Sequence, residues 1–136
     1  MTEIENQLSK RAARRIIQRA FVLMGRDKSL RHHIREADLT TLWTLEDWDL
    51  AWTVALRRGR FEVERRPAKH PDVTLTWATA EEFFRPDDPT QDGSEQVRLE
   101  PAEGHRRFFQ LLLRGFFNSL RHVLRNPVDD TGESLL

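Results

Sequence analysis

The sequence predicts an α+β fold, a mostly antiparallel twisted sheet of about five strands with helices packed on one face. Three observations predict it. A stretch near each end of the chain repeats apolar residues at the spacing of an α-helix. Between these stretches, residues 39–77 alternate apolar and polar residues at the period of two that half-buried strands require. Turn-forming residues divide this central part into segments of strand length.

Composition places the chain among globular domains, with 136 residues of which 38% are hydrophobic and 32% charged. We expect residues 1–127 to form one domain and residues 128–136 to be a disordered acidic tail. The absence of cysteine excludes disulfides and thiolate metal sites. No apolar run reaches the roughly 18 residues that cross a bilayer. Basic residues also interrupt the N-terminal region where a secretory signal would be apolar, so we expect a cytoplasmic protein.

Residues 4–24 predict an amphipathic helix. Its polar face is basic and carries Arg11, Arg14, Arg15, Gln18 and Arg19. Its apolar face carries Ala13, Ile16, Ile17, Ala20, Phe21, Leu23 and Met24. Gly25 follows at a position typical of a helix end, and Ser29 predicts the cap of a second, short helix over residues 30–36. The first helix either packs on the core or lies on an anionic membrane surface, and both interpretations stay open.

The strands are predicted from alternation and turns. They are expected at residues 39–45, 48–56, 61–64, 73–77 and 96–100. Glu46-Asp47 connects the first two as a hairpin, and Gly59 marks the next turn because glycine accepts positive φ. Thr79 predicts the cap of a short helix that presents Phe83 and Phe84. Residues 86–95 have the composition of a loop.

Residues 105–125 predict the strongest helix, because apolar residues cover about half of its circumference. We expect part of this arc to cover the sheet. The remainder would then need another partner, as a dimer contact or a lid. The residues expected to remain uncovered are Phe109, Leu113, Phe117 and Leu124.

One ordered set of segments resembles a known family. A hairpin with its turn at Gly59 leads to Pro-Asp-Val-Thr-Leu-Thr at residues 71–76, and then to a capped short helix at residues 79–84. In this order, residues 39–85 resemble the sterol carrier protein 2 domain. The resemblance implies non-enzymatic binding of an apolar ligand between sheet and helices, as a carrier or accessory factor. The ligand would be a lipid, fatty acyl, sterol or isoprenoid quinone.

The walls of such a pocket are expected where inward strand residues face the apolar arc of the last helix. They are Trp43, Trp52, Val54, Trp77, Phe84, Phe108, Leu112 and Phe116. Ligand pockets are mostly apolar with few polar groups, which fits this set. The same residues would equally serve as the walls of a solid core.

Enzymatic chemistry is not expected. No Gly-x-Ser-x-Gly elbow and no glycine-rich phosphate loop is present, and adjacent His32 and His33 would point about 100° apart on a helix. We therefore expect no cofactor and no metal. A net charge of zero argues against nucleic acid as a partner. The expected partners are an apolar small molecule or lipid, a second copy of the chain, and an anionic membrane surface. The alternative function is protein interaction or dimerisation through the aromatic C-terminal helix, with no ligand.

Overall fold

The structure of the 136-residue chain is a computed structural model that describes residues 9–84, 97–101 and 103–136. The predictions for residues 4–8, 86–95 and Gln96 lie outside the described residues. In chain order the elements are α2 (Lys10–Arg26), α3 (Lys28–His33), β1 (Asp38–Leu45), β2 (Leu50–Arg57), β3 (Phe61–Glu64), β4 (Val73–Trp77), α4 (Ala80–Phe84), β5 (Arg98–Glu100) and α5 (Arg106–Arg125).

The strands form one five-stranded sheet in the order β3-β2-β1-β4-β5. Three neighbouring pairs are antiparallel, and the β1–β4 pair is parallel. The predicted α+β class and mostly antiparallel five-stranded sheet are confirmed. The parallel pair arises because β3 and β4 run in the same direction on opposite sides of the β2–β1 hairpin. The connection between them crosses the sheet, where the Thr53 hydroxyl donates to the Arg66 carbonyl at 2.6 Å.

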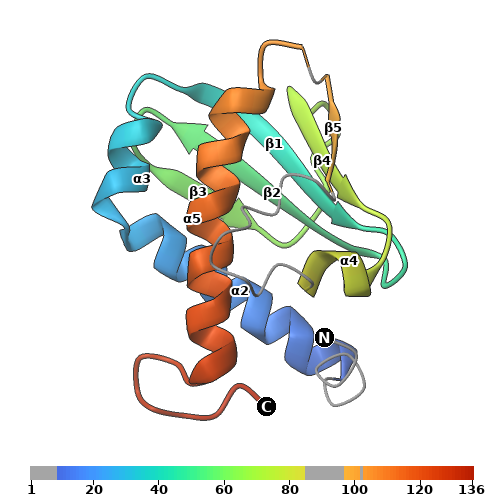
Figure 1. Ribbon diagram of the computed structural model, residues 1–136, viewed down its shortest axis with the longest axis vertical. Coiled ribbons are helices and arrows are strands. Elements are labelled where there is room, and N and C mark those ends of the chain that lie inside the picture. Colours follow the sequence, from blue (N-terminus) through green and yellow to red (C-terminus); the bar gives the residue numbers. More distant parts are fainter. Residues whose placement is uncertain (1–8, 85–96, 102) are drawn as a thin grey trace.

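The helices lie on one face of this sheet, and α2 packs against α5 in front of the strands (Figure 1). The sheet residues that face the helices are large and buried, among them Trp43, Trp52, Leu75 and Trp77. The opposite face presents smaller and more polar residues, such as Thr44, and is half-buried. This difference is why the helices pack on one face, because burial of large apolar side chains is the main driving force for packing.

The boundaries of α2 and α3 differ from prediction, since Ser9 caps α2 rather than lying within the helix and α3 ends at His33 rather than at residue 36. Helix α2 continues through Gly25 to Arg26. Asp27, rather than Ser29, caps α3, because its carboxylate accepts hydrogen bonds from the Ser29 and Leu30 amides. An aspartate before the first helical residue satisfies two of the free amides of that turn, which leaves the serine inside the helix. At Thr79 the prediction is confirmed, since its hydroxyl accepts from the Glu82 amide at 3.1 Å.

Strand β2 begins at Leu50, two residues later than predicted. Residues 46–49 form the turn, in which Asp49 has a positive φ of 51°. Trp48 therefore leaves the strand and lies near Phe84, with ring centroids 6.3 Å apart. The longer turn also lets Asp47 accept a hydrogen bond from the Ala80 amide at 2.9 Å, so it joins the hairpin to α4.

The C-terminal segment is folded, and the expectation of a disordered tail is wrong. Val128 and Ser134 form an antiparallel bridge. The Asp129 carboxylate closes the turn between them by accepting hydrogen bonds from the Thr131 and Glu133 amides. Leu135 is buried against the rest of the chain. Aspartate side chains favour such local turns, and here the turn places one apolar side chain where it can pack.

The apolar arc of α5 is covered within the chain. Phe109, Leu113 and Phe117 are each 1% exposed, and Leu124 is half-buried. The expectation that these residues would stay uncovered is wrong, because α2, α4 and the sheet surround more of the helix than one sheet face alone would. Leu111 is the exposed apolar residue on this helix, at 45%.

Two helical glycines should respond oppositely to substitution by alanine. A Cβ at Gly115 would lie 2.4 Å from a methyl carbon of Leu30, whereas a Cβ at Gly25 would lie 3.9 Å from the Cβ of Phe61. Because Leu30 is itself buried, overpacking of about 1–3 kcal/mol should exceed the helix-propensity gain of about 1 kcal/mol. We expect Gly115→Ala to lower the free energy of unfolding by about 1 kcal/mol and Gly25→Ala to raise it by about 0.5 kcal/mol. Urea denaturation measures both, and a Gly115→Ala protein more stable than wild type would contradict the packing.

Candidate functional site

An aromatic cluster fills the space between the sheet and the helices. The Trp43 ring in β1 lies 5.2 Å from Phe21 of α2, 5.8 Å from Trp77 of β4 and 5.0 Å from Phe116 of α5, measured between centroids. Phe83 of α4 joins this cluster through Trp77 at 5.1 Å and an edge contact to Phe116 at 6.0 Å. Five elements therefore meet through rings in the edge-to-face and tilted arrangements that aromatic side chains prefer.

The residues predicted as pocket walls are brought together, with one exception. Seven belong to the buried core, namely Trp43, Trp52, Val54, Trp77, Phe84, Leu112 and Phe116. Phe108 is half-buried at the start of α5 and stacks on His33, with centroids 4.6 Å apart. Of the predicted residues, Trp43, Trp52 and Trp77 line a small cavity between α2, α4 and the sheet, with a volume of about 10 Å³. That is at most the space of one water molecule, so a ligand could enter here only if side chains moved apart.

The three core indoles differ in their hydrogen bonding. Trp43 Nε1 donates to the Thr41 hydroxyl at 2.9 Å, and Trp52 Nε1 donates to the Gln18 side-chain oxygen at 3.0 Å. Trp77 Nε1 is buried and has no partner among the described residues. A buried donor without a partner costs free energy, and it lies beside the small cavity.

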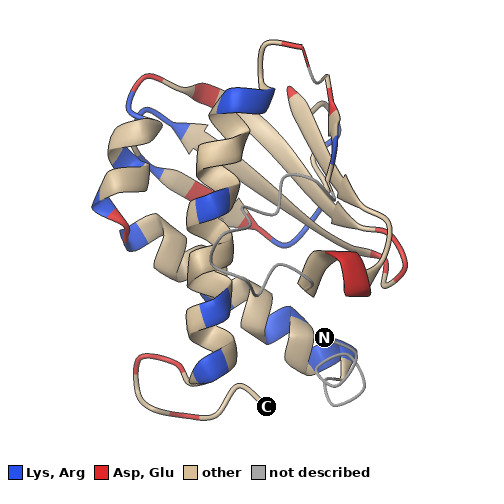
Figure 2. Cartoon of the chain, in the orientation of Figure 1, with Lys and Arg blue, Asp and Glu red and all other residues tan. Residues whose placement is uncertain are grey.

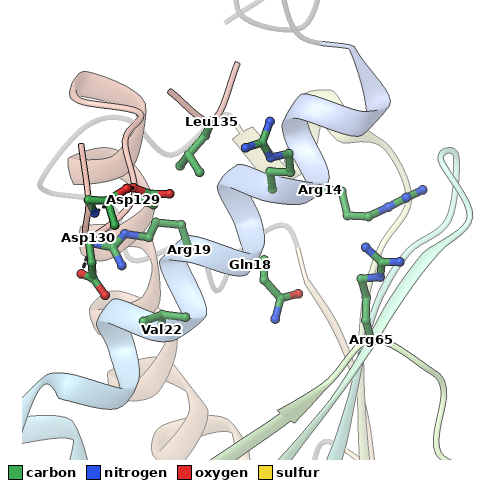
Figure 3. Close-up of a pocket in the computed structure, with 10 residues that line it drawn as sticks. Arg14, Gln18, Arg19, Val22, Arg65, Asp129, Asp130 and Leu135 are labelled. Atoms are coloured by element: carbon green, nitrogen blue, oxygen red, sulfur yellow. Dashed lines mark hydrogen bonds and ion pairs between the residues drawn. The ribbon is translucent and has the colours of Figure 1, made fainter. Parts of the chain in front are cut away.

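A larger hollow lies on the outer side of α2. This groove, which we call the arginine groove, has a volume of about 460 Å³. Its lining residues are Arg14, Arg15, Gln18, Arg19, Val22, Arg65, Asp129, Asp130, Thr131 and Leu135. Figure 3 shows α2 along the groove, with Arg65 on the strand side and Asp129, Asp130 and Leu135 on the side of the C-terminal segment.

Some arginines in and beside the groove pair with Asp130, and others have no partner among the described residues. Asp130 binds both Arg26, at 2.7 Å and 2.9 Å, and Arg19, at 3.0 Å. The Arg26 hydrogen bonds, and then those of Arg19, hold the pKa of the Asp130 carboxyl well below its usual range. Arg14 and Arg65 have no ion pair or hydrogen bond with any described residue. Cationic groups without an internal partner are free to bind an anion from solution.

Apolar surface accompanies these charges. Val22 on α2 is 40% exposed, whereas most large apolar side chains of the described helices are buried. Leu135 of the C-terminal segment also lines the groove. The aliphatic stems of the arginines add further apolar surface. Gln18 joins the groove to the core, because the same side chain that lines the groove accepts the Trp52 hydrogen bond.

Sequence reasoning identified the basic face of the first helix but missed two sides of the groove. Arg65 follows β3 and continues the alternation that turns Phe61 and Val63 toward the helix side. The tail residues were missed because their segment was expected to be disordered. A signal was available in the charges, since an acidic segment at Asp129 and Asp130 complements a helix whose polar face is basic.

Residues 9–84, 97–101 and 103–136 contain no group of three His, Asp or Glu side chains placed to hold a metal ion. None of the helices formed by them is both long and apolar enough to cross a membrane.

Comparisons with known proteins found little. No family model and no curated protein matches the chain. The stereoselective inverting sec-alkylsulfatase Pisa1 from Pseudomonas sp. is similar over 61% of this chain and 13% of its own length, with 19% identity and a TM-score of 0.43. A double mutant of PisA1 matches over 60% and 14%, with 25% identity and a TM-score of 0.42. This chain thus spans only a small part of either protein, and the resemblance to sterol carrier protein 2 stays a prediction.

The burial of α5 can be tested at Phe117. Its ring lies 5.5 Å from Phe83 and 6.1 Å from Trp77, and the side chain is 1% exposed. We expect Phe117→Ala to lower the free energy of unfolding by about 3–5 kcal/mol, the usual cost of removing a core phenylalanine. Leu111→Ala on the exposed side of the same helix should change it by less than about 0.5 kcal/mol. Equal, small effects in thermal or urea unfolding would show that the ring is not packed.

Proposed function

We propose that the protein binds an amphipathic lipid-class ligand, with an apolar chain and a carboxylate or phosphate group, and does not convert it chemically. The observation that carries this proposal is the arginine groove of about 460 Å³, where arginine side chains without partners lie beside exposed apolar surface. A fatty acyl ligand with a free carboxylate fits this description best among the ligands expected from the sequence. A role as a carrier or accessory factor in the cytoplasm belongs to the same proposal.

The anionic group would be held by Arg14 and Arg65, which face the groove from α2 and from the end of β3. A guanidinium group presents several N–H donors in a plane and pairs with carboxylate or phosphate through two parallel hydrogen bonds. Two arginines on different elements would therefore fix the position of the anionic group rather than only attract it.

The apolar chain would lie along Val22 and the arginine stems. Each Å² of apolar surface removed from water contributes roughly 25 cal/mol, so even a shallow groove supports binding of a long chain. A position inside the aromatic core is less favourable, because the cavity there is about 10 Å³ and the rings are packed. Sterol and quinone ligands, which lack an anion, gain nothing from the arginines.

The alternative function, dimerisation through the C-terminal helix, has less support. The aromatic residues of α5 that would make such a contact, including Phe109 and Phe117, are already buried within the chain. A partner of this helix would meet its polar side, where Leu111 is the exposed apolar residue.

Titration with oleate, followed by tryptophan emission and calorimetry, tests the proposal. We expect wild type to bind oleate more tightly than its neutral methyl ester. The double variant Arg14→Ala/Arg65→Ala should bind oleate about tenfold more weakly, because two exposed charge pairs contribute about 0.2–1 kcal/mol each. The matched control is Arg107→Ala, an exposed arginine on α5 outside the groove, which should bind as wild type does.

Trp52 supplies the optical signal, because its hydrogen bond to Gln18 connects it to the groove. If wild type and the double variant bind oleate equally, the groove is not the site of the anionic group. If neither oleate nor the methyl ester binds at micromolar concentration, the proposed function is wrong.

A further inference from the structure

The C-terminal segment, residues 128–136, lies along one side of the arginine groove and is itself amphipathic. Figure 2 shows acidic residues on this segment below the end of α5, and Figure 3 shows Asp130 beside Arg19 of α2. Asp130 presents both carboxylate oxygens to Arg26 and one of them also to Arg19. Leu135, from the same segment, lines the groove and is 6% exposed. One short segment thus places a carboxylate on arginines and an aliphatic group on the apolar part of the groove.

This arrangement reproduces the two features of the proposed ligand. The Asp130 carboxylate occupies the position of an anionic group between two guanidinium groups, in the paired geometry that a free carboxylate or a phosphate would adopt. Leu135 covers the apolar surface that an acyl chain would cover. The protein therefore satisfies part of its own groove when no ligand is bound.

The contacts that hold the segment in place are of a kind that a ligand can replace. The described backbone hydrogen bonds of the segment stay within residues 126–136, such as those from the Leu135 amide to the Pro127 carbonyl and from the Asp129 amide to the Glu133 carbonyl. The described bonds to α2 come from arginine side chains, which reach the Asp130 carboxylate and, from Arg15, the Ser134 carbonyl at 3.3 Å. The Asp130 and Arg26 side chains are 58% and 55% exposed, and that of Arg19 is 16% exposed. Exposed ion pairs contribute little to stability because water and salt screen them. A ligand that replaces these contacts and covers the apolar surface beside Leu135 would let the segment move as a folded unit about residues 126–127.

We infer that the C-terminal segment is an internal competitor for the arginine groove, which an anionic amphiphile displaces when it binds. The carboxylate or phosphate of the ligand, held by Arg14 and Arg65, competes with Asp130 for Arg19, which lines the same groove, and the chain of the ligand takes the place of Leu135. This inference rests on the proposed function, since it concerns regulation of the same groove. Binding would then expose the segment, so that its position reports whether the groove is occupied.

Protonation does not release the segment near neutral pH. Its two arginine partners keep the pKa of Asp130 well below its ordinary value, so the carboxylate stays charged throughout that range.

Asp130→Asn tests the inference in the full chain, with Glu133→Gln as the matched control. Both substitutions remove one negative charge from the same exposed segment, but Glu133 makes no ion pair with the described arginines. We expect Asp130→Asn to bind oleate about five- to tenfold more tightly than wild type, because Arg19 and Arg26 become available. Glu133→Gln should bind as wild type does, and neither variant should bind methyl oleate more tightly. Circular dichroism checks that each variant remains folded.

A second measurement follows the segment itself. Because the chain contains no cysteine, Glu133→Cys provides a single thiol for a nitroxide label. We expect oleate to increase the mobility of this label in its electron paramagnetic resonance spectrum, and methyl oleate to have a smaller effect.

The outcomes separate the inference from the proposed function. If wild type and Asp130→Asn bind oleate with equal affinity, or if the label does not respond to bound oleate, the segment is not a competitor and the proposed function stands. If Asp130→Asn tightens the binding of oleate and of methyl oleate equally, the ligand carboxylate does not compete with the Asp130 carboxylate, and the inference is wrong. If neither protein binds oleate, the proposed function and the inference both fail.

Discussion

The rings of Phe21, Trp43 and Phe116 meet with centroids 4.8–5.2 Å apart, and each comes from a different element. Phe21 lies on α2, Trp43 on the central strand β1 and Phe116 on α5. Because large rigid rings pack in few arrangements, these contacts fix the distance of both helices from the sheet and their rotation about their own axes. The α4 helix follows from the same contacts, since Phe83 packs on Phe116 and on Trp77.

The rotation of α2 decides which of its residues reach the solvent. When Ile17, Phe21 and Met24 face the core, Arg15, Arg19 and Val22 must lie on other sides of the helix. The arginine groove is therefore a consequence of core packing. Gln18 lies at the boundary between the two faces, where it lines the groove and satisfies the Trp52 indole. A shift of the Trp52 ring would therefore also move the Gln18 side chain in the groove, because the two are hydrogen-bonded.

Local patterns predicted most of the fold. The alternation of Trp43, Trp52, Val54 and Trp77 with polar neighbours identified strands and their inward faces, because burial on one face imposes a period of two. It did not specify that β4 lies beside β1 in parallel, since pairing partners depend on contacts between distant segments. The extent of burial on α5 also depends on tertiary packing, because residues such as Phe117 are covered by the Phe83 ring of α4 rather than by the sheet alone.

Only the α2 side of the candidate site could be predicted from the sequence, because the other sides depend on contacts between distant segments. The basic face of α2 is visible as a helical repeat of arginines, whereas Arg65 and the C-terminal segment reach the groove only through the tertiary fold. Leu135 is a single apolar residue in a polar segment and has no periodicity to indicate burial. What orders this segment is the combination of a local turn closed by Asp129 with the pairing of Asp130 to Arg19 and Arg26.

The zero net charge of the chain hides this internal pairing. A helix face rich in arginine is compensated partly by a segment more than 100 residues later, at Arg26 and Asp130, with a sequence separation of 104. Compensation by a movable segment differs from compensation by a fixed neighbour, because the charges of the helix become available whenever the segment leaves. The net charge, a sum over the whole chain, therefore gives no sign of the basic surface that an anionic ligand would meet once Asp130 is displaced.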